Sequence, residues 1–208
     1  MTTEHPASAA EREIFIAHLP ELQPVTAVKN VLLQVSIAQL KSSGLFEQYE
    51  ALVDPAVPAQ ILASLALSWT PIELALAHYG ACENMMLRSE QLSGIGGRVG
   101  DRLQETSFVS AAKKTQESQV DVWSEVGAMH RMWARQFQGG SVQVAKHGPN
   151  DMSLELRGFR LNKFRYYREA QLAAIGAAYR ALGVGILPLK IAYYSASRDE
   201  LAIRIRWT

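Results

Sequence analysis

The sequence predicts an α+β fold in which an N-terminal layer of five or six helices packs on a C-terminal ββαββ unit with a four-stranded antiparallel sheet. Hydrophobic residues recur at helical spacing up to about Gln138, and from Gly139 onward they alternate with polar residues as in strands. A run of helices followed by a run of strands is typical of an antiparallel sheet that is covered by helices. Hydrophobic residues make up 48% of the chain and charged residues 20%, which is the composition of a protein with a packed core.

The N-terminal half begins with a polar, proline-interrupted arm over residues 1–24, in which the apolar run IFIAHL is long enough for one helical turn. Gly44 is placed to end the first long helix. The clearest helix start is TPIE, where Thr70 can cap, Pro71 needs no N–H partner and Glu73 completes a capping box. The segments predicted to be helical are 26–43, 45–53, 58–69, 70–91, 93–115 and 120–137.

The C-terminal half reads as two hairpins that flank one helix. The strings SVQVAKH and MSLELRGF are joined by the turn GPND, and the strings LKIAYYS and LAIRIRW by the turn ASRDE. The helix between the hairpins is YYREAQLAAIGAAYRALG, which ends at Gly183. We therefore expect a single α+β domain over residues 25–208.

Cysteine content, charge and hydropathy narrow the class of protein. One cysteine excludes an internal disulfide framework, and neither a secretory signal nor a membrane-spanning run is visible. We expect a cytoplasmic protein. The net charge of +1 conceals an asymmetry, because residues 1–138 hold ten Lys and Arg against fifteen Asp and Glu, whereas residues 139–208 hold eleven against five. The two halves either attract one another or present opposite charge to partners.

Three strings, LKSSGLFEQYEALV, WTPIELALAHYGACENM and the closing RIRW, resemble a family of proteins frequent in myxobacteria and related Gram-negative bacteria. The fold of that family is similar to the 4-vinyl-reductase-like sensor domains, the heme-NO-binding domains and the TRAPP vesicle-tethering subunits. The resemblance covers the chain from about Val28 to the C-terminus. It implies helices over a four-stranded sheet, sometimes with an apolar ligand pocket between the layers, and it implies no shared activity.

His78, Cys82 and Met85 share one face of the helix predicted from Thr70. Imidazole, thiol and thioether groups suit zinc, copper or haem iron, but a structural zinc site would need two more ligands. The heme-NO-binding relatives carry a later Tyr-x-Ser-x-Arg motif for the haem propionates, and the nearest string here, FRYYR, departs from it. The alternative is that these side chains simply fill the core. We favour packing, and expect no metal, no cofactor and no catalytic residue.

The same face is the best candidate for a ligand pocket. Met and Trp supply polarizable walls and histidines supply sparse polar anchors, a composition found at small-molecule sites. A dry core of the same residues is the competing interpretation. The candidate pocket residues are Leu74, His78, Cys82, Met85, Val126, Met129, His130 and Trp133.

Two glycine- and alanine-rich stretches suggest close packing of helices. SGIGGRVG does not match a dinucleotide-binding loop, because Val99 stands where the third glycine belongs and a helix precedes it. Its glycines are better suited to a close approach by another helix. Ala170, Ala173, Ala174, Ala177 and Ala181 form a small-residue face that permits close approach within the fold or across a homodimer.

The string RGFRLNKFRYYREAQ interleaves basic and aromatic residues, a pattern that can bind phosphates and stack bases. The near-neutral charge of the whole chain makes nucleic acid an unlikely partner. An acidic partner, or the acidic helical half of the chain itself, is the alternative. The candidate anion- or partner-binding residues are Arg157, Arg160, Lys163, Arg165 and Arg168.

Taken together, the residues predict a non-enzymatic sensor or regulatory module with a site for a small apolar ligand between helices and sheet. No cluster of acids, bases or nucleophiles of the kind that enzymes carry is visible in the sequence. The alternative is a protein-interaction or scaffold module with a packed interior and no ligand.

Overall fold

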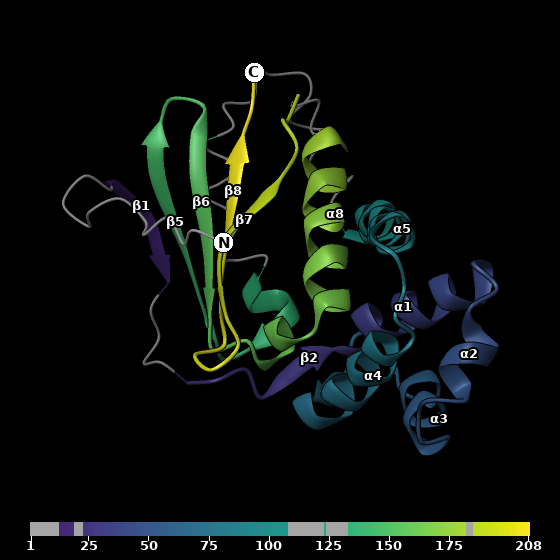
Figure 1. Cartoon of the computed structure of the whole chain (residues 1–208). Coiled ribbons are helices and arrows are strands. Elements are labelled where there is room, and N and C mark those ends of the chain that lie inside the picture. The colour runs from purple at the N-terminus through teal and green to yellow at the C-terminus, as the bar shows by residue number, and fades with distance from the viewer. Residues whose placement is uncertain (1–12, 19–22, 108–122, 124–132, 182–184) are drawn as a thin grey trace.

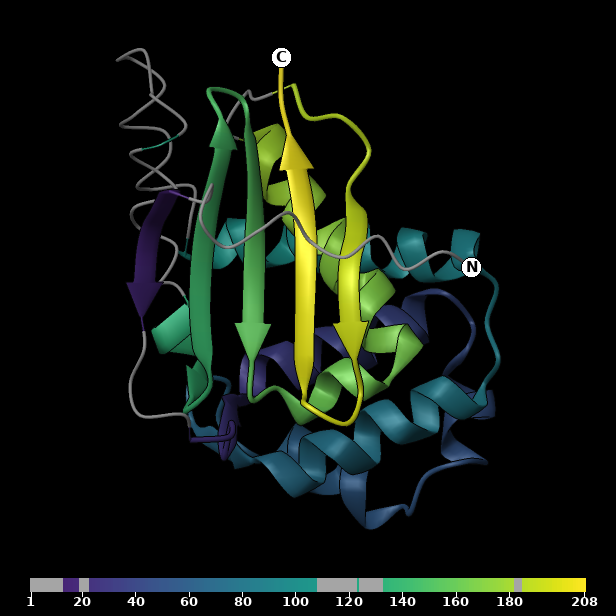
Figure 2. The same ribbon diagram turned by 60° about the vertical axis from the view of Figure 1, so that its left-hand side comes forward.

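The computed structural model describes residues 13–18, 23–107, 123, 133–181 and 185–208 (Figure 1). A five-stranded antiparallel sheet forms one side of the molecule, and helices lie on one of its faces (Figures 1 and 2). The α+β class predicted from the sequence is confirmed. Among the described residues, no helix has the length and apolar character needed to cross a membrane.

The helical layer is built from the N-terminal half of the chain. The helix α8 (Arg165–Ala181), from the C-terminal half, lies between these helices and the sheet (Figure 1). The N-terminal helices are α1 (Asn30–Ser42), α2 (Phe46–Glu50), α3 (Ala56–Ala63), α4 (Ile72–Asn84) and α5 (Ser89–Ser107). The helix predicted over 120–137 falls largely outside the described residues.

The main sheet has the strand order β1-β5-β6-β8-β7, and all neighbours in it are antiparallel. Its strands are β1 (Glu13–His18), β5 (Ser141–Gly148), β6 (Asp151–Arg157), β7 (Lys190–Ser195) and β8 (Glu200–Arg206). The prediction of four strands is wrong, because β1 pairs with β5 and adds a fifth. This part of the expected N-terminal arm is therefore a strand and not a helical turn. An edge strand leaves backbone groups unpaired, and β1 supplies partners for those of β5.

A second sheet of three very short strands joins the two halves of the chain. Its order is β3-β2-β4, with β2 (Ala27–Lys29), β3 (Trp69–Pro71) and β4 (Phe137–Gln138). The sequence predicted helix at all three places. Pairing with distant segments overrides the helical spacing of apolar residues here. The strand β2 pairs with β3, about 40 residues later in the sequence, and with β4, more than 100 residues later.

The start of α4 differs from the predicted capping box. Thr70 belongs to β3, and its hydroxyl donates to Oδ1 of Asn30 at 3.0 Å instead of capping the helix. The helix begins at Ile72 and ends at Asn84, before the predicted end at Gln91. The predicted stop at Gly44 is confirmed, because this residue follows α1 with φ of +68°, a conformation that favours glycine.

Apolar side chains of β5, β6 and β8 line the face of the main sheet that packs on the helices. Eight side chains on alternate positions of β5, β6 and β8 are at most 4% exposed, as expected where a sheet packs on helices. They are Val142, Val144, Met152, Leu154, Leu156, Leu201, Ile203 and Ile205. This face and the helical layer form one continuous core.

The helices α5 and α8 approach each other so closely that glycine is required. A Cβ atom built on Gly96 would lie 2.5 Å from the carbonyl oxygen of Ala170, and one on Gly100 would lie 2.8 Å from Cα of Ala174. The alanine face of α8 therefore packs inside the chain. The suggested close approach of the SGIGGRVG glycines to another helix is confirmed for Gly96 and Gly100. Four of the five alanines of the small-residue face, Ala170, Ala173, Ala174 and Ala177, lie against α5 within the fold.

Candidate functional site

His78 is the centre of a buried polar network in the helical layer. Its side chain is fully buried on α4. Nδ1 lies 2.9 Å from the hydroxyl of Tyr49 on α2, and Nε2 lies 3.0 Å from the hydroxyl of Ser36 on α1. Cys82, one turn along α4, places its sulfur 3.8 Å from the same Nε2. Both ring nitrogens are thus satisfied by hydroxyl groups from neighbouring helices.

Burial keeps this network uncharged. It lowers the pKa of His78 to about 3, so the imidazole is neutral at physiological pH. It also raises the pKa of the Cys82 thiol well above its ordinary value. A nucleophilic cysteine requires a thiolate that is accessible and supported by positive charge, and the buried, neutral Cys82 offers neither. The pair is placed for packing and hydrogen bonding.

Aromatic residues connect this network to the start of α8. The ring of Tyr79 on α4 lies 6.2 Å from that of Tyr166 and 5.1 Å from that of Tyr167, measured between centroids. The hydroxyl of Tyr166 faces Ser36 and Cys82 without forming a hydrogen bond of ordinary geometry. The carboxylate of Glu83 accepts the backbone N–H of Tyr166 at 2.7 Å, which fixes the first turn of α8 against α4.

A second aromatic cluster lies where the small sheet meets the connection after β6. The ring of Trp133 stacks on Phe137 at 5.1 Å and meets the edge of Phe159 at 5.7 Å. Trp133 is 6% exposed, and its Nε1 is buried without a hydrogen-bond partner among the described residues. A buried indole N–H without an acceptor is uncommon in native proteins.

The structure brings together part of the predicted pocket. His78 and Cys82 lie buried on α4, the buried Met85 directly follows its last residue, and Leu74 is partly buried on the same helix. The described ring contacts of Trp133 are with Phe137 and Phe159. Three of the predicted pocket residues lie outside the described part of the chain, namely Val126, Met129 and His130.

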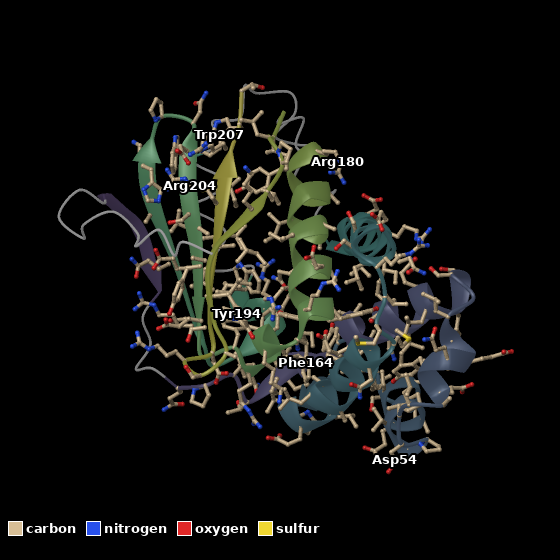
Figure 3. The ribbon with its side chains drawn as sticks, in the orientation of Figure 1. Asp54, Phe164, Arg180, Tyr194, Arg204 and Trp207 are labelled. Atoms are coloured by element: carbon tan, nitrogen blue, oxygen red, sulfur yellow. The ribbon has the colours of Figure 1, made fainter. Side chains whose placement is uncertain are left out.

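The predicted basic cluster is largely occupied with contacts inside the chain. Arg160 pairs with Glu73 of α4 at 3.0 Å, and Arg165 donates to the Ser89 hydroxyl at the start of α5 at 2.6 Å. These contacts support the alternative that the basic segment serves the acidic helical half of its own chain. Near the start of α8, where Figure 3 labels Phe164 and Tyr194, Lys163 lies over the Phe164 ring and Arg168 over the Tyr194 ring. Arg168 also donates to the carbonyl oxygens of Asn162 and Lys163. Arg157 pairs with Glu155 on β6.

Sequence reasoning missed the hydroxyl partners of His78. Ser36 interrupts an otherwise apolar helix face, and Tyr49 is fully buried although it lies in a short helix rich in acidic residues. The signal available in the sequence was Ser36, a polar residue inside an apolar helical stripe. Such a residue indicates a buried hydrogen-bond partner elsewhere in the chain, but it does not identify that partner.

Comparison with known proteins gives a clear answer on the fold alone. The chain matches no protein-family model and no curated protein. Among solved structures it is similar to an Fe(II) unliganded H-NOX protein from K. algicida, with a TM-score of 0.57 and 6% sequence identity over 86% of this chain and 96% of that one. The fold is that of the H-NOX domains.

Two further H-NOX structures show the same similarity. An oxygen-binding H-NOX domain related to soluble guanylate cyclases matches with a TM-score of 0.54 and 11% identity, over 86% of this chain and 95% of that one. An H-NOX structure from a study of heme distortion matches with a TM-score of 0.58 and 10% identity, over 86% and 95% of the two chains. The heme-NO-binding part of the resemblance expected from the sequence is confirmed at the level of fold.

Neither histidine whose side chain the structure describes fits as an axial ligand to haem. Haem iron requires an axial ligand with a free donor atom. His78 has both ring nitrogens engaged by Tyr49 and Ser36, and Nε2 of His147 lies 2.9 Å from the Ser153 hydroxyl. Within the described ranges, no three His, Cys, Asp or Glu side chains converge as metal ligands.

Proposed function

We propose that the chain is a sensor or regulatory module, without catalytic activity of its own, that binds a small apolar molecule between its helical layer and its sheet. The H-NOX-like fold supports this proposal, because H-NOX structures include an oxygen-binding domain. The ligand we propose is not haem, since both histidines whose side chains the structure describes, His78 and His147, are engaged elsewhere.

The buried Nε1 of Trp133 is the observation that carries the proposal. A buried donor without an acceptor costs about 1–3 kcal/mol, and no described residue accepts from this one. Among the described residues, its ring contacts are with Phe137 and Phe159. An apolar molecule with one acceptor oxygen would bury its hydrocarbon part against these rings and satisfy the indole N–H.

Mass spectrometry tests the proposal directly. A retained ligand appears as excess mass in native spectra that is absent from denaturing spectra. We expect the purified protein to be colourless, without a Soret band. A stoichiometric Soret band would contradict the assignment of a non-haem ligand.

A matched pair of variants tests the role of the indole. An apolar ligand that raises the melting temperature of the wild type is expected to lose most of that effect with Trp133→Phe, which keeps a ring and removes the N–H. Trp123→Phe removes an indole N–H that donates to the carbonyl oxygen of Pro149, beside Trp207, and should leave the effect unchanged. A broad ligand screen without any thermal shift would refute ligand binding.

The second candidate is a protein-interaction module with a packed interior. The satisfied network around His78 and the close packing of α5 on α8 favour this alternative. It predicts that Trp133→Ala lowers the free energy of unfolding by about 3–5 kcal/mol, and that no apolar ligand restores stability.

A further inference from the structure

The segment between α3 and α4 presents leucines to solvent. Residues 64–69, which we call the leucine loop, include Leu65 at 81% exposure and Leu67 at 77%, and the nearby Leu62 on α3 is 46% exposed. The loop follows α3, on the side of the helical layer away from the main sheet (Figure 1). Exposed clusters of this kind mark binding surfaces more often than isolated exposed leucines do.

The leucine loop is held rigidly by side chains of α1. Nδ2 of Asn30 and Nε2 of Gln34 both donate to the carbonyl oxygen of Ser64, at 3.1 and 2.8 Å. The buried Asn30 amide also reaches the carbonyl oxygen of Ile61 at 2.9 Å. A rigid loop loses little conformational entropy when it binds. The exposed leucines are therefore already held in the geometry in which they bind.

Every carbonyl oxygen from Ser64 to Ser68 accepts a hydrogen bond from within the chain. Those of Leu65 and Leu67 accept from the Ser68 hydroxyl at 2.7 Å and from Nζ of Lys29 at 2.8 Å. Those of Ala66 and Ser68 accept from the backbone N–H groups of Val31 and Asn30, at 2.8 and 3.0 Å. Hydrocarbon supplies no donors, so a carbonyl oxygen that enters it must accept from within the chain, as these five do.

The charges around the loop fit an anionic lipid surface. No charged residue lies between Asp54 and Glu73 in the sequence. Both flanking acids are engaged, Asp54 with the N–H of Ala56 and Glu73 with Arg160. The ammonium of Lys29 lies 3.8 Å from the centre of the Trp69 ring, and Trp with Lys is a pair found at the level of lipid headgroups.

We propose that the leucine loop is a membrane-surface anchor, in which Leu65 and Leu67 enter the acyl region of an anionic leaflet while Trp69 and Lys29 remain at the headgroups. A lipid surface is favoured over a protein partner, because the carbonyl oxygens of residues 64–68 already accept hydrogen bonds from within the chain, whereas a protein interface would recruit such groups for its own hydrogen bonds. The inference is independent of the proposed ligand site.

Cosedimentation of the full chain with vesicles tests the proposal. We expect binding to vesicles of phosphatidylglycerol and phosphatidylcholine in equal parts, and weaker binding to phosphatidylcholine alone. Leu65→Asp and Leu67→Asp should each lower the vesicle partition coefficient about tenfold, because each removes an apolar side chain that the bound protein would bury in the acyl region. Lys29→Gln should lower binding to the anionic vesicles about fivefold.

Met86→Asp is the matched control, because Met86 is 84% exposed and lies outside the loop. It introduces the same charge and should leave binding unchanged. Leu65→Gln serves as a second variant if Leu65→Asp impairs folding. Absence of wild-type binding to both vesicle types would overturn the proposal, and so would equal binding by the leucine variants. A dimer in solution that Leu65→Asp dissociates would also overturn it, because a second copy would then occupy the loop.

Discussion

Replacement of Gly96 by alanine tests the closest helix contact in the fold. A Cβ at Gly96 would lie 2.5 Å from the carbonyl oxygen and 2.6 Å from Cα of Ala170, and 2.8 Å from Cβ of Ala173. Two of these atoms belong to the backbone of α8, so no side-chain rotation relieves the contact. The helices must separate, at a cost of about 3 kcal/mol for overpacking.

The net effect follows from two opposing terms. Alanine is favoured over glycine in a helix by about 1 kcal/mol, which leaves Gly96→Ala destabilised by about 2 kcal/mol. For a chain of this size that loss lowers the melting temperature by about 4–8 °C. Urea unfolding, followed by circular dichroism, measures the change in the free energy of unfolding.

The same helix supplies the control. A Cβ at Gly94 would meet nothing within 4 Å, and the position is exposed. Gly94→Ala is therefore expected to raise the free energy of unfolding by about 1 kcal/mol through helix propensity alone. If Gly96→Ala proved as stable as Gly94→Ala, the close approach of α5 and α8 would be refuted.

Three further predictions concern the polar contacts. Because the native pKa of His78 is lowered to about 3 from an ordinary value of 6.5, the unfolded chain binds a proton that the native chain does not, and stability falls as pH drops from about 6.5 towards 3. The slope contributed by His78 approaches about 1.4 kcal/mol per pH unit, and His78→Gln should remove it from unfolding curves measured between pH 6.5 and 5. Tyr49→Phe leaves Nδ1 of His78 without its partner and should lower the free energy of unfolding by about 1–3 kcal/mol. A double-mutant cycle on Arg160 and Glu73, whose side chains are 42% and 71% exposed, should give a coupling below about 1 kcal/mol.

Each of these predictions has a result that would contradict it. An unchanged pH profile in His78→Gln would show that the ring titrates normally and is accessible to water. A neutral effect of Tyr49→Phe would place another donor or acceptor, or a water molecule, at Nδ1. A coupling of several kcal/mol between Arg160 and Glu73 would require that the pair be shielded from solvent, contrary to its exposure.

The fold class and the two C-terminal hairpins could be predicted from the sequence because both rest on local periodicity. Alternation between polar and apolar residues places Val144, Leu154 and Ile203 on one face of a sheet, and all three are at most 1% exposed. The glycines of SGIGGRVG likewise indicated helix contact, because residues without side chains are costly in a helix unless something approaches them.

The candidate site was less predictable. The spacing of His78 and Cys82 correctly placed them on one helix face, yet spacing cannot reveal that Ser36 and Tyr49 satisfy the imidazole from 42 and 29 residues away. Thr70 illustrates the same limit. Its sequence context matches a capping box, but the tertiary fold directs its hydroxyl to Asn30, whose amide in turn organises the leucine loop.

The sequence by itself determined the change from helical to alternating periodicity near Gly139, the apolar faces of the two C-terminal hairpins and a helix contact made through glycines, because these depend on residues near one another along the chain. Only the tertiary structure decided the fifth strand, the small sheet and the partners of His78 and of the leucine loop. Each of these joins segments tens of residues apart, and such pairings are selected by the total free energy of burial and hydrogen bonding in the folded chain, which no local pattern records.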